Sequence, residues 1–211
     1  MPTDTWWNLP PDKRERIIHA AKVEFAKGGF SAGSLNVISR DAGIAKGSLF
    51  QYFTDKLDLF ATICDAGSED IQAAALKGVD PDTMGYFEAV HRMMTNWLRF
   101  FRAHPVERGI AFAAANEVDP EARAAVRSIT NERFVTVFAP MAKRAADLGE
   151  LRPGVDTDQL VAMTVMLFRH LNSAPFYEHM DPVLDLTRKS AKEVERISHE
   201  LVEALARAYT G

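Results

Sequence analysis

Apolar residues recur every three or four positions along most of this chain, and stretches that alternate β-branched and polar residues are almost absent. A period of three to four residues is that of helices that bury one face, so the pattern predicts an all-α fold. Prolines and glycines mark most of the expected helix ends. The predicted helices cover residues 10–29, 35–42, 44–53, 54–64, 87–101, 106–117, 121–148, 157–171 and 191–209.

A short helix with a sharp stop is predicted before Gly43. Ser34 is a residue type that caps helix N-termini. An apolar face at helical spacing consists of Val37, Ile38 and Ala42. Gly43 fits the left-handed position that closes a helix, because glycine has no side chain to meet the backbone there.

The helix after this turn has two different faces. Its apolar side, at three- and four-residue intervals, consists of Leu49, Tyr52 and Phe53, and its other side carries Lys46, Gly47, Ser48 and Gln51. Ser39 is small enough for a close crossing of the two helices, and Ile44 is placed to fill the space between them. The combination predicts a helix-turn-helix at about residues 34–53.

The chemistry of the second helix suits DNA. A helix N-terminus presents unpaired N–H groups and partial positive charge, so Lys46, Gly47 and Ser48 can approach a phosphate together. Gln51 can pair with the N6 and N7 atoms of adenine, a contact worth roughly 1–3 kcal/mol of discrimination. The alternative is that Lys46 and Gln51 only solvate an exposed helix face.

The stretch from Gly33 to Phe60, GSLNVISRDAGIAKGSLFQYFTDKLDLF, resembles the DNA-binding segment of the TetR family of transcriptional regulators. The preceding IIHAAKVEFAKGGF, residues 17–30, is similar to that family's first helix. The resemblance covers about the first sixty residues. It implies a three-helix DNA-binding domain, assigned to residues 1–56, and a helical domain for effector binding and dimerisation, assigned to residues 57–211. It also implies repression that an effector relieves.

When the family's functional residues are carried over by position, the resemblance implies that Lys46 and Ser48 contact phosphate or a base. It places Tyr52 and Lys56 on the DNA backbone at the other end of the helix, and Ser34 and Asn36 on phosphate before the turn. The full predicted DNA-binding set is Ser34, Asn36, Ala45, Lys46, Gly47, Ser48, Gln51, Tyr52 and Lys56.

Two positions depart from the family's pattern. Phe50 stands where a tyrosine is common, and Ala45 where serine or threonine is common. Both departures remove a hydroxyl. Phe50 can still pack against a sugar or a thymine methyl group, but it cannot donate a hydrogen bond to phosphate.

Charge is unevenly distributed along the 211 residues. The formal net charge is −4, yet residues 1–60 contain eight Lys and Arg against seven acids, and the remainder contains seventeen against twenty-two. The N-terminal part is thus about neutral and the acidity lies in the C-terminal part. This distribution favours a compact contact surface over a general polycation.

Two C-terminal segments are predicted to form a homodimer. Residues 157–171 are strongly apolar, and residues 191–209 carry an apolar stripe of Val194, Ile197, Leu201, Val202 and Leu205. Pairing of both helices with their copies gives a four-helix interface, as the resemblance implies. The alternative is that these stripes close the core of a single chain.

The central helices are rich in aromatic residues and methionine, which line adaptable apolar cavities. The resemblance implies an effector cavity there, and a small hydrophobic or aromatic molecule is the expected ligand. The alternative is that these side chains fill the core. The predicted ligand-binding residues are Trp97, Phe101, Phe112, Asn116, Phe134, Phe138, Met163, Leu167 and His170.

Other chemistry has little support in the sequence. The six histidines lack metal-ligand spacing, and no phosphate-binding glycine loop or nucleophile elbow is present, so no cofactor and no metal are expected. The single cysteine, Cys64, excludes an intrachain disulfide. With no secretion signal and no apolar run of membrane-spanning length, the expected location is the cytoplasm.

Three classes of function are compatible with the sequence. A ligand-responsive, dimeric DNA-binding repressor accounts for the helix-turn-helix. An all-α enzyme requires an acid, base or nucleophile set that the sequence does not display, so no enzymatic activity is expected. A helical ligand-binding or interaction module without DNA binding draws only on Phe50 and Ala45, and the retained Lys46 and Ser48 argue against it.

Overall fold

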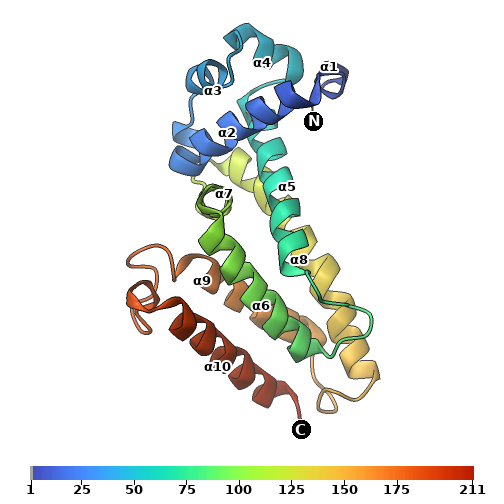
Figure 1. Cartoon of the computed structure of the whole chain (residues 1–211). Coiled ribbons are helices and arrows are strands. Elements are labelled where there is room, and N and C mark those ends of the chain that lie inside the picture. Colours follow the sequence, from blue (N-terminus) through green and yellow to red (C-terminus); the bar gives the residue numbers. More distant parts are fainter. Residues whose placement is uncertain (1) are drawn as a thin grey trace. The chain divides into compact units, whose positions relative to one another are not determined.

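Helices account for the regular secondary structure of residues 2–211, which are the residues that this computed structural model describes (Figure 1). No strand occurs in that range, so the predicted all-α fold is confirmed. The helices are α1 (Asp4–Trp7), α2 (Pro11–Ala32), α3 (Leu35–Asp41), α4 (Lys46–Tyr52), α5 (Lys56–Ala75), α6 (Tyr86–Ala103), α7 (Pro105–Ala115), α8 (Pro120–Asp147), α9 (Thr157–Ser173), the short 3-10 helix η1 (Leu186–Arg188) and α10 (Ala191–Tyr209).

The sequence signals place most helix ends within a few residues. Gly29 has a φ of 61° and interrupts α2 where the glycine pair predicts its end, although one further turn continues to Ala32. Asp156 caps α9 by accepting hydrogen bonds from the N–H groups of Asp158 and Gln159. Ser190 and Glu193 cap α10 reciprocally. Helix α1 has no counterpart among the predicted helices.

The chain divides into two compact units. The first contains the chain up to Asp70 together with His104–Thr130, and the second contains Ile71–Ala103 and Asn131–Gly211. Each unit has its own hydrophobic core. These units describe packing, and the functional boundary at residues 56 and 57 stays a prediction.

The core of the first unit lies between α2, the two short helices α3 and α4, and the N-terminal half of α5. Phe25 and Phe60 are fully buried, and their ring centroids are 5.0 Å apart in an edge-to-face arrangement. Helix α7 packs against α2 through Gly109, where an added Cβ would lie 2.8 Å from the Cβ of Ala26. A side chain at position 109 would therefore force these two helices apart.

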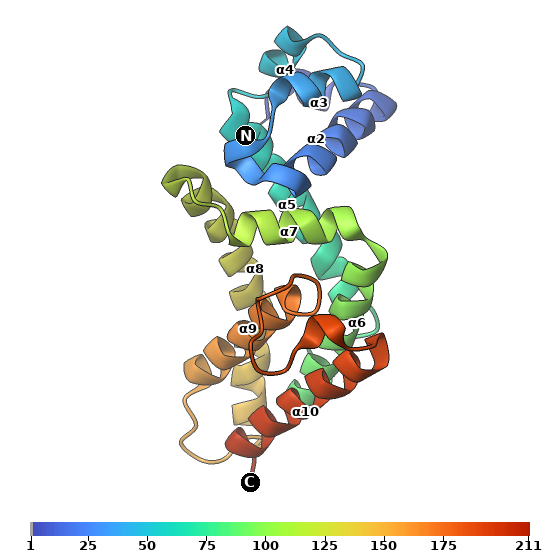
Figure 2. The same ribbon diagram turned by 90° about the vertical axis from the view of Figure 1, so that its left-hand side faces the viewer.

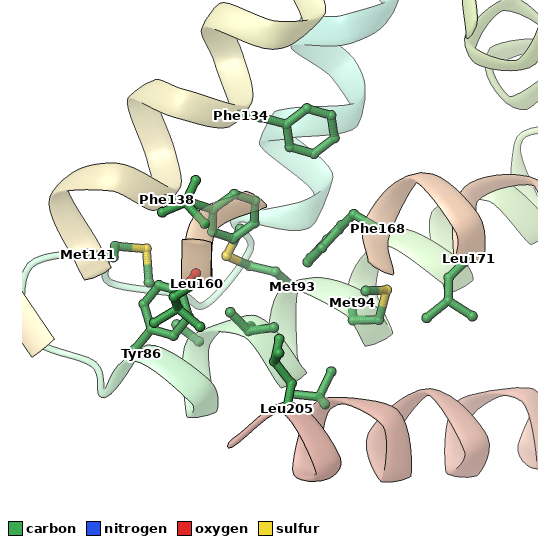
Figure 3. Close-up of a cluster of buried hydrophobic side chains, with 14 of the residues drawn as sticks. Tyr86, Met93, Met94, Phe134, Phe138, Met141, Leu160, Phe168, Leu171 and Leu205 are labelled. Carbon is green, nitrogen blue, oxygen red and sulfur yellow. The ribbon is translucent and has the colours of Figure 1, made fainter. Parts of the chain in front are cut away.

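The core of the second unit is built by α6, α8, α9 and α10 (Figure 3). Buried side chains from all four helices meet there, among them Met94, Phe138, Phe168 and Leu205. The hydroxyl groups of Tyr86 and Thr164 are 2.9 Å apart inside this core, which pairs two buried polar groups.

Helix α10 packs against α6 within the same chain, as Figure 2 shows. Of its predicted dimerisation stripe, Val194, Ile197, Val202 and Leu205 are at most 9% exposed. Assigning this stripe to the dimer interface is therefore wrong, because α6 already covers it. A hydrophobic period shows that a face is buried but does not show which helix buries it.

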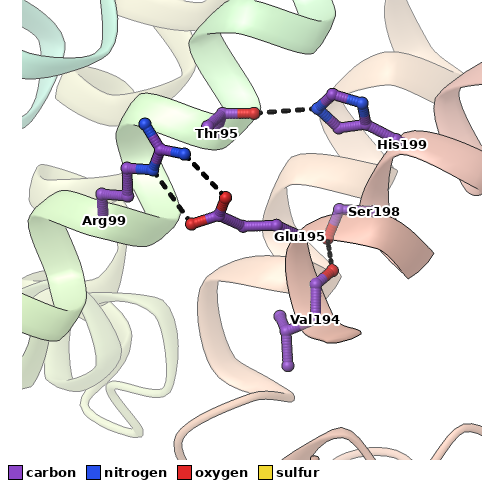
Figure 4. A network of polar contacts seen from close by, with 6 residues as sticks. All are labelled: Thr95, Arg99, Val194, Glu195, Ser198 and His199. Carbon is purple, nitrogen blue, oxygen red and sulfur yellow. Dashed lines mark hydrogen bonds and ion pairs between the residues drawn. The ribbon is translucent and has the colours of Figure 1, made fainter. Parts of the chain in front are cut away.

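Polar contacts join the same two helices beside the apolar stripe (Figure 4). The guanidinium of Arg99 donates two hydrogen bonds to the Glu195 carboxylate, at 3.0 and 2.8 Å. The hydroxyl of Thr95 and Nε2 of His199 are 3.0 Å apart. Since Arg99 is solvent-exposed, this ion pair fixes the orientation of α10 on α6 more than it adds to stability.

Candidate nucleic-acid interface

The turn between α3 and α4 is a Schellman motif. The N–H of Ile44 donates to the carbonyl oxygen of Ser39 at 2.9 Å, and the N–H of Gly43 donates to that of Arg40 at 3.1 Å. Gly43 has a φ of 66°, and a Cβ added there would meet no other atom within 4 Å. Glycine is thus favoured by the backbone conformation and not by lack of space. The predicted turn is confirmed.

The start and the crossing point of α3 also follow the prediction. The Oγ of Ser34 accepts a hydrogen bond from the N–H of Val37, so Ser34 caps the helix. Its own N–H donates to the carboxylate of Glu24 in α2 at 2.9 Å. Ser39 and Ala42 are buried, as expected of small residues where two helices cross closely.

Helix α4 has one buried face and one exposed face. Leu49 and Tyr52 are 2% and 3% exposed, whereas Lys46, Gly47, Phe50 and Gln51 are exposed. Ser48 is half-buried. Ala45 stands at the N-cap position without a side-chain hydrogen bond to the helix. On α3, Asn36 is exposed. The structure therefore leaves most of the predicted DNA-binding residues accessible.

Tyr52 and Lys56 have structural contacts of their own. The Tyr52 ring lies against Trp6, with 6.2 Å between ring centroids, and the Nζ of Lys13 is 5.6 Å from the centroid of the same ring. Lys56 donates to the carbonyl oxygen of Ser31 at 3.4 Å, and its Nζ lies 4.8 Å from the centroid of the Phe30 ring. Phosphate contacts by Tyr52 and Lys56 stay predictions, and both side chains brace the first unit.

Sequence reasoning missed the segment that precedes α2. Trp6 is 2% exposed and packs against Phe53 with 4.8 Å between ring centroids. Thr3 donates two hydrogen bonds to the end of α4, from its N–H to the carbonyl oxygen of Tyr52 and from its Oγ1 to that of Gln51. The signal for it in the sequence was the pair of adjacent tryptophans, Trp6 and Trp7, in a short segment before the first predicted helix.

A buried acid was missed as well. Glu117, 5% exposed, lies just before α8. Its carboxylate accepts hydrogen bonds from the N–H groups of Phe30, Val118 and Asp119 and from the Oγ of Ser31, at 2.8 to 3.0 Å. Burial raises the pKa of Glu117, but these hydrogen bonds together outweigh that effect, so its pKa lies below the usual range. The carboxylate thus ties the end of α2 to the loop that follows α7.

The predicted ligand-binding residues are divided between the two units. Trp97, Phe101, Phe134 and Phe138 belong to one aromatic cluster of the second unit, in which the ring centroids of Trp97 and Phe134 are 5.9 Å apart. Phe168, left out of the predicted set, completes it at 5.3 Å from Trp97 and 5.2 Å from Phe138.

The remaining predicted ligand contacts lie on α9 and in the first unit. Met163 and His170 are exposed on α9, and Leu167 is half-buried. Phe112 and Asn116 belong to the first unit. The Asn116 side chain is exposed at the end of α7, where its amide donates to the carbonyl oxygen of Phe112 at 2.8 Å. A ligand contact by Asn116 stays a prediction.

Within residues 2–211, no three His, Cys, Asp or Glu side chains come together in a way that could hold a metal ion. Among the same residues, no helix combines the length and the apolar character needed to cross a membrane.

Two crossing helices, a glycine turn between them and an exposed polar face on the second define the first unit as a helix-turn-helix domain. Residues 17–63 match the family described as "Bacterial regulatory proteins, tetR family". The match includes α3, α4 and the turn between them. The chain thus carries a DNA-binding segment of the kind found in TetR-family transcriptional regulators.

Individual relatives support the same assignment. The repressor KstR of Mycolicibacterium smegmatis is 29% identical over 120 residues, which are 51% of this chain and 56% of that protein. The chain spans about half the length of the first curated relatives that it matches. A TetR-family regulator of Chloroflexus aurantiacus has a TM-score of 0.70 and 26% identity, covering 100% of this chain and 99% of that one.

A second solved structure is similar in fold alone. The regulator FadR of Bacillus subtilis, solved in complex with stearoyl-CoA, has a TM-score of 0.74 at 14% identity. The comparison covers 91% of this chain and 97% of FadR. The fold of this chain is thus also found in FadR.

Proposed function

We propose that this protein is a sequence-specific repressor that binds a near-palindromic operator as a homodimer and leaves it when a small hydrophobic or aromatic effector binds. The observation that carries the proposal is the exposed face of α4, which presents Lys46, Gly47 and Gln51 while Leu49 and Tyr52 anchor the helix. A short helix anchored on one face and polar on the other suits the major groove of DNA.

The exposed residues divide into two roles. Gln51 reads a base edge, because its amide can donate and accept in the same plane. Lys46 and Ser48 contact phosphate at the start of α4, and Ser34 and Asn36 do so at the start of α3. Phe50, 51% exposed, packs against a sugar or a thymine methyl group.

Replacing Gln51 and Lys46 separately tests this division. Gln51→Ala is expected to remove about 1–3 kcal/mol of preference for the operator over sites changed at one position. Lys46→Ala is expected to weaken binding to operator and random DNA alike and to lower the salt slope, d log K/d log[salt], by about one unit. Binding titrations at several salt concentrations measure both effects.

Lys143→Ala is the matched control, because it removes the same charge from an exposed position in the second unit. Lys143→Ala should leave both the preference for the operator and the salt slope unchanged. Equal effects of Gln51→Ala on operator and random DNA would refute the base-reading role of Gln51. A salt slope that Lys46→Ala leaves unaltered would refute the phosphate contact.

The dimer interface is assigned to the exposed face of α9 together with the outer face of α10. Met163 and Met166 are 45% and 57% exposed, one turn apart on α9. Large apolar side chains grouped on a helix surface favour a contact with another chain. A twofold dimer places two copies of α4 about one DNA turn apart, which requires a near-palindromic site.

The effector site is assigned to the aromatic cluster of the second unit. Trp97 is half-buried, and its Nε1 donates to the side-chain oxygen of Asn172 at 3.4 Å, so the cluster has a polar group at its edge. FadR, which has a similar fold, was solved with stearoyl-CoA, whose acyl chain is apolar, and this supports an effector with an apolar part. A hundredfold drop in operator affinity requires that the effector favour the non-binding conformation by about 2.7 kcal/mol.

A further inference from the structure

The C-terminal end of α4, the recognition helix, is capped by a segment distant in sequence. The last carbonyl groups of a helix have no partner within it, and many helices satisfy them with a left-handed glycine. Phe53 follows α4 in an extended conformation, with φ −130° and ψ 139°, so α4 has no such cap. The carbonyl oxygens of Gln51 and Tyr52 instead accept hydrogen bonds from Thr3, at 2.6 and 2.9 Å.

The same segment is anchored by its tryptophan. Trp6 is buried against Tyr52 and Phe53, and α1 lies beside α4 in Figure 1. A helix of seven residues is not stable alone, so α4 depends on the contacts that its neighbours make with it. Thr3 and Trp6 supply such contacts at the end of the helix that carries Gln51.

We propose that Thr3 and Trp6 position the recognition helix for DNA, and that Thr3 is a positioning residue which acts through the backbone of Gln51 without touching DNA. These residues precede the segment 17–63 that matches the family, so the family match gives them no role. The inference rests on the proposed function, because it concerns DNA affinity. Whether the hydrogen bonds from Thr3 stabilise α4 can be tested without DNA.

Three variants test the proposal. Thr3→Val removes the hydroxyl and keeps the shape, Thr3→Ser keeps the hydroxyl, and Trp7→Ala removes a side chain of α1 that is 61% exposed. The probe is double-stranded DNA that the wild-type protein has selected from a random pool. Because Thr3→Val lacks one hydrogen bond to α4, its affinity for this DNA is expected to be about threefold to tenfold lower than that of the wild type. Thr3→Ser and Trp7→Ala should bind like the wild type.

Hydrogen exchange of the free proteins gives the second readout. In Thr3→Val, the amides of residues 46–53 should exchange faster, whereas those of residues 11–25 should not, because the opening is local. General destabilisation would accelerate exchange in both segments and would overturn the proposal.

Three further results would contradict the proposal. Weaker DNA binding without faster exchange would mean that Thr3 touches DNA itself, and faster exchange with unchanged affinity would mean that its hold on α4 has no effect on binding. An equal loss in Trp7→Ala would mean that the surface of α1 binds DNA. If the wild type selects no DNA, the proposed function fails, and the exchange result alone decides whether Thr3 holds α4.

Discussion

Replacing Glu117 with alanine is expected to lower the free energy of unfolding of the first unit by about 3 kcal/mol, since three part-buried N–H groups and one hydroxyl lose their acceptor at once. The N–H groups belong to Phe30, Val118 and Asp119, and they lie on two segments that the carboxylate holds together. Denaturant titration followed by circular dichroism measures the loss. The exposed Glu121 is the control, and its replacement by alanine should change stability by less than about 0.5 kcal/mol.

The contribution of Glu117 should depend on pH in a defined direction. Because the pKa of Glu117 is lowered in the folded protein, the carboxylate stabilises the fold above the ordinary glutamate value of 4.5. That stabilisation is lost as the pH falls through the lowered value. The stability difference between the wild type and Glu117→Gln should therefore be constant near neutral pH and shrink below about pH 4.5. A difference that stays constant down to pH 3 would contradict the ionised carboxylate.

The second large effect is expected in the aromatic cluster. Phe138→Ala should cost about 3–5 kcal/mol of stability, because removing a buried ring leaves a cavity that its neighbours fill only in part. Phe138 is 1% exposed, and its ring centroid lies 6.1 Å from that of Phe134. Chemical denaturation of the second unit measures the cost.

Val135→Ala provides the control on the same helix, because Val135 is 56% exposed and its truncation should be nearly neutral. A cost below about 1 kcal/mol for Phe138→Ala would mean that the ring is not part of a well-packed core. Such a result would favour an open effector cavity at this position over the packed arrangement of the structure.

Features set by short-range chemistry were predictable from the sequence. Gly43 identified the turn because few other residues adopt a positive φ without strain, and Ser34 identified the start of α3 because its side chain caps its own helix. The exposed and buried faces of α4 followed from spacing alone. These three features define the candidate DNA-binding face.

Features set by distant partners were not predictable. The hydrogen-bond partners of Glu117 in α2 lie 86 and 87 residues away, and a lone glutamate gives no sign of them. Helix α1 has four residues and is held in place by contacts with α4, so no helical period marks it. The stripe on α10 identified a buried face, but its partner is α6 and not a second chain.

Sequence-specific DNA binding can be tested by selecting bound sequences from a random pool of double-stranded DNA, with the purified protein and a salt titration. We expect enrichment of a near-palindrome whose half-sites lie about one helical turn apart. We also expect an affinity that falls steeply with salt. A folded dimer that enriches no sequence would contradict the proposed repressor function and would favour a helical ligand-binding or interaction module without DNA binding.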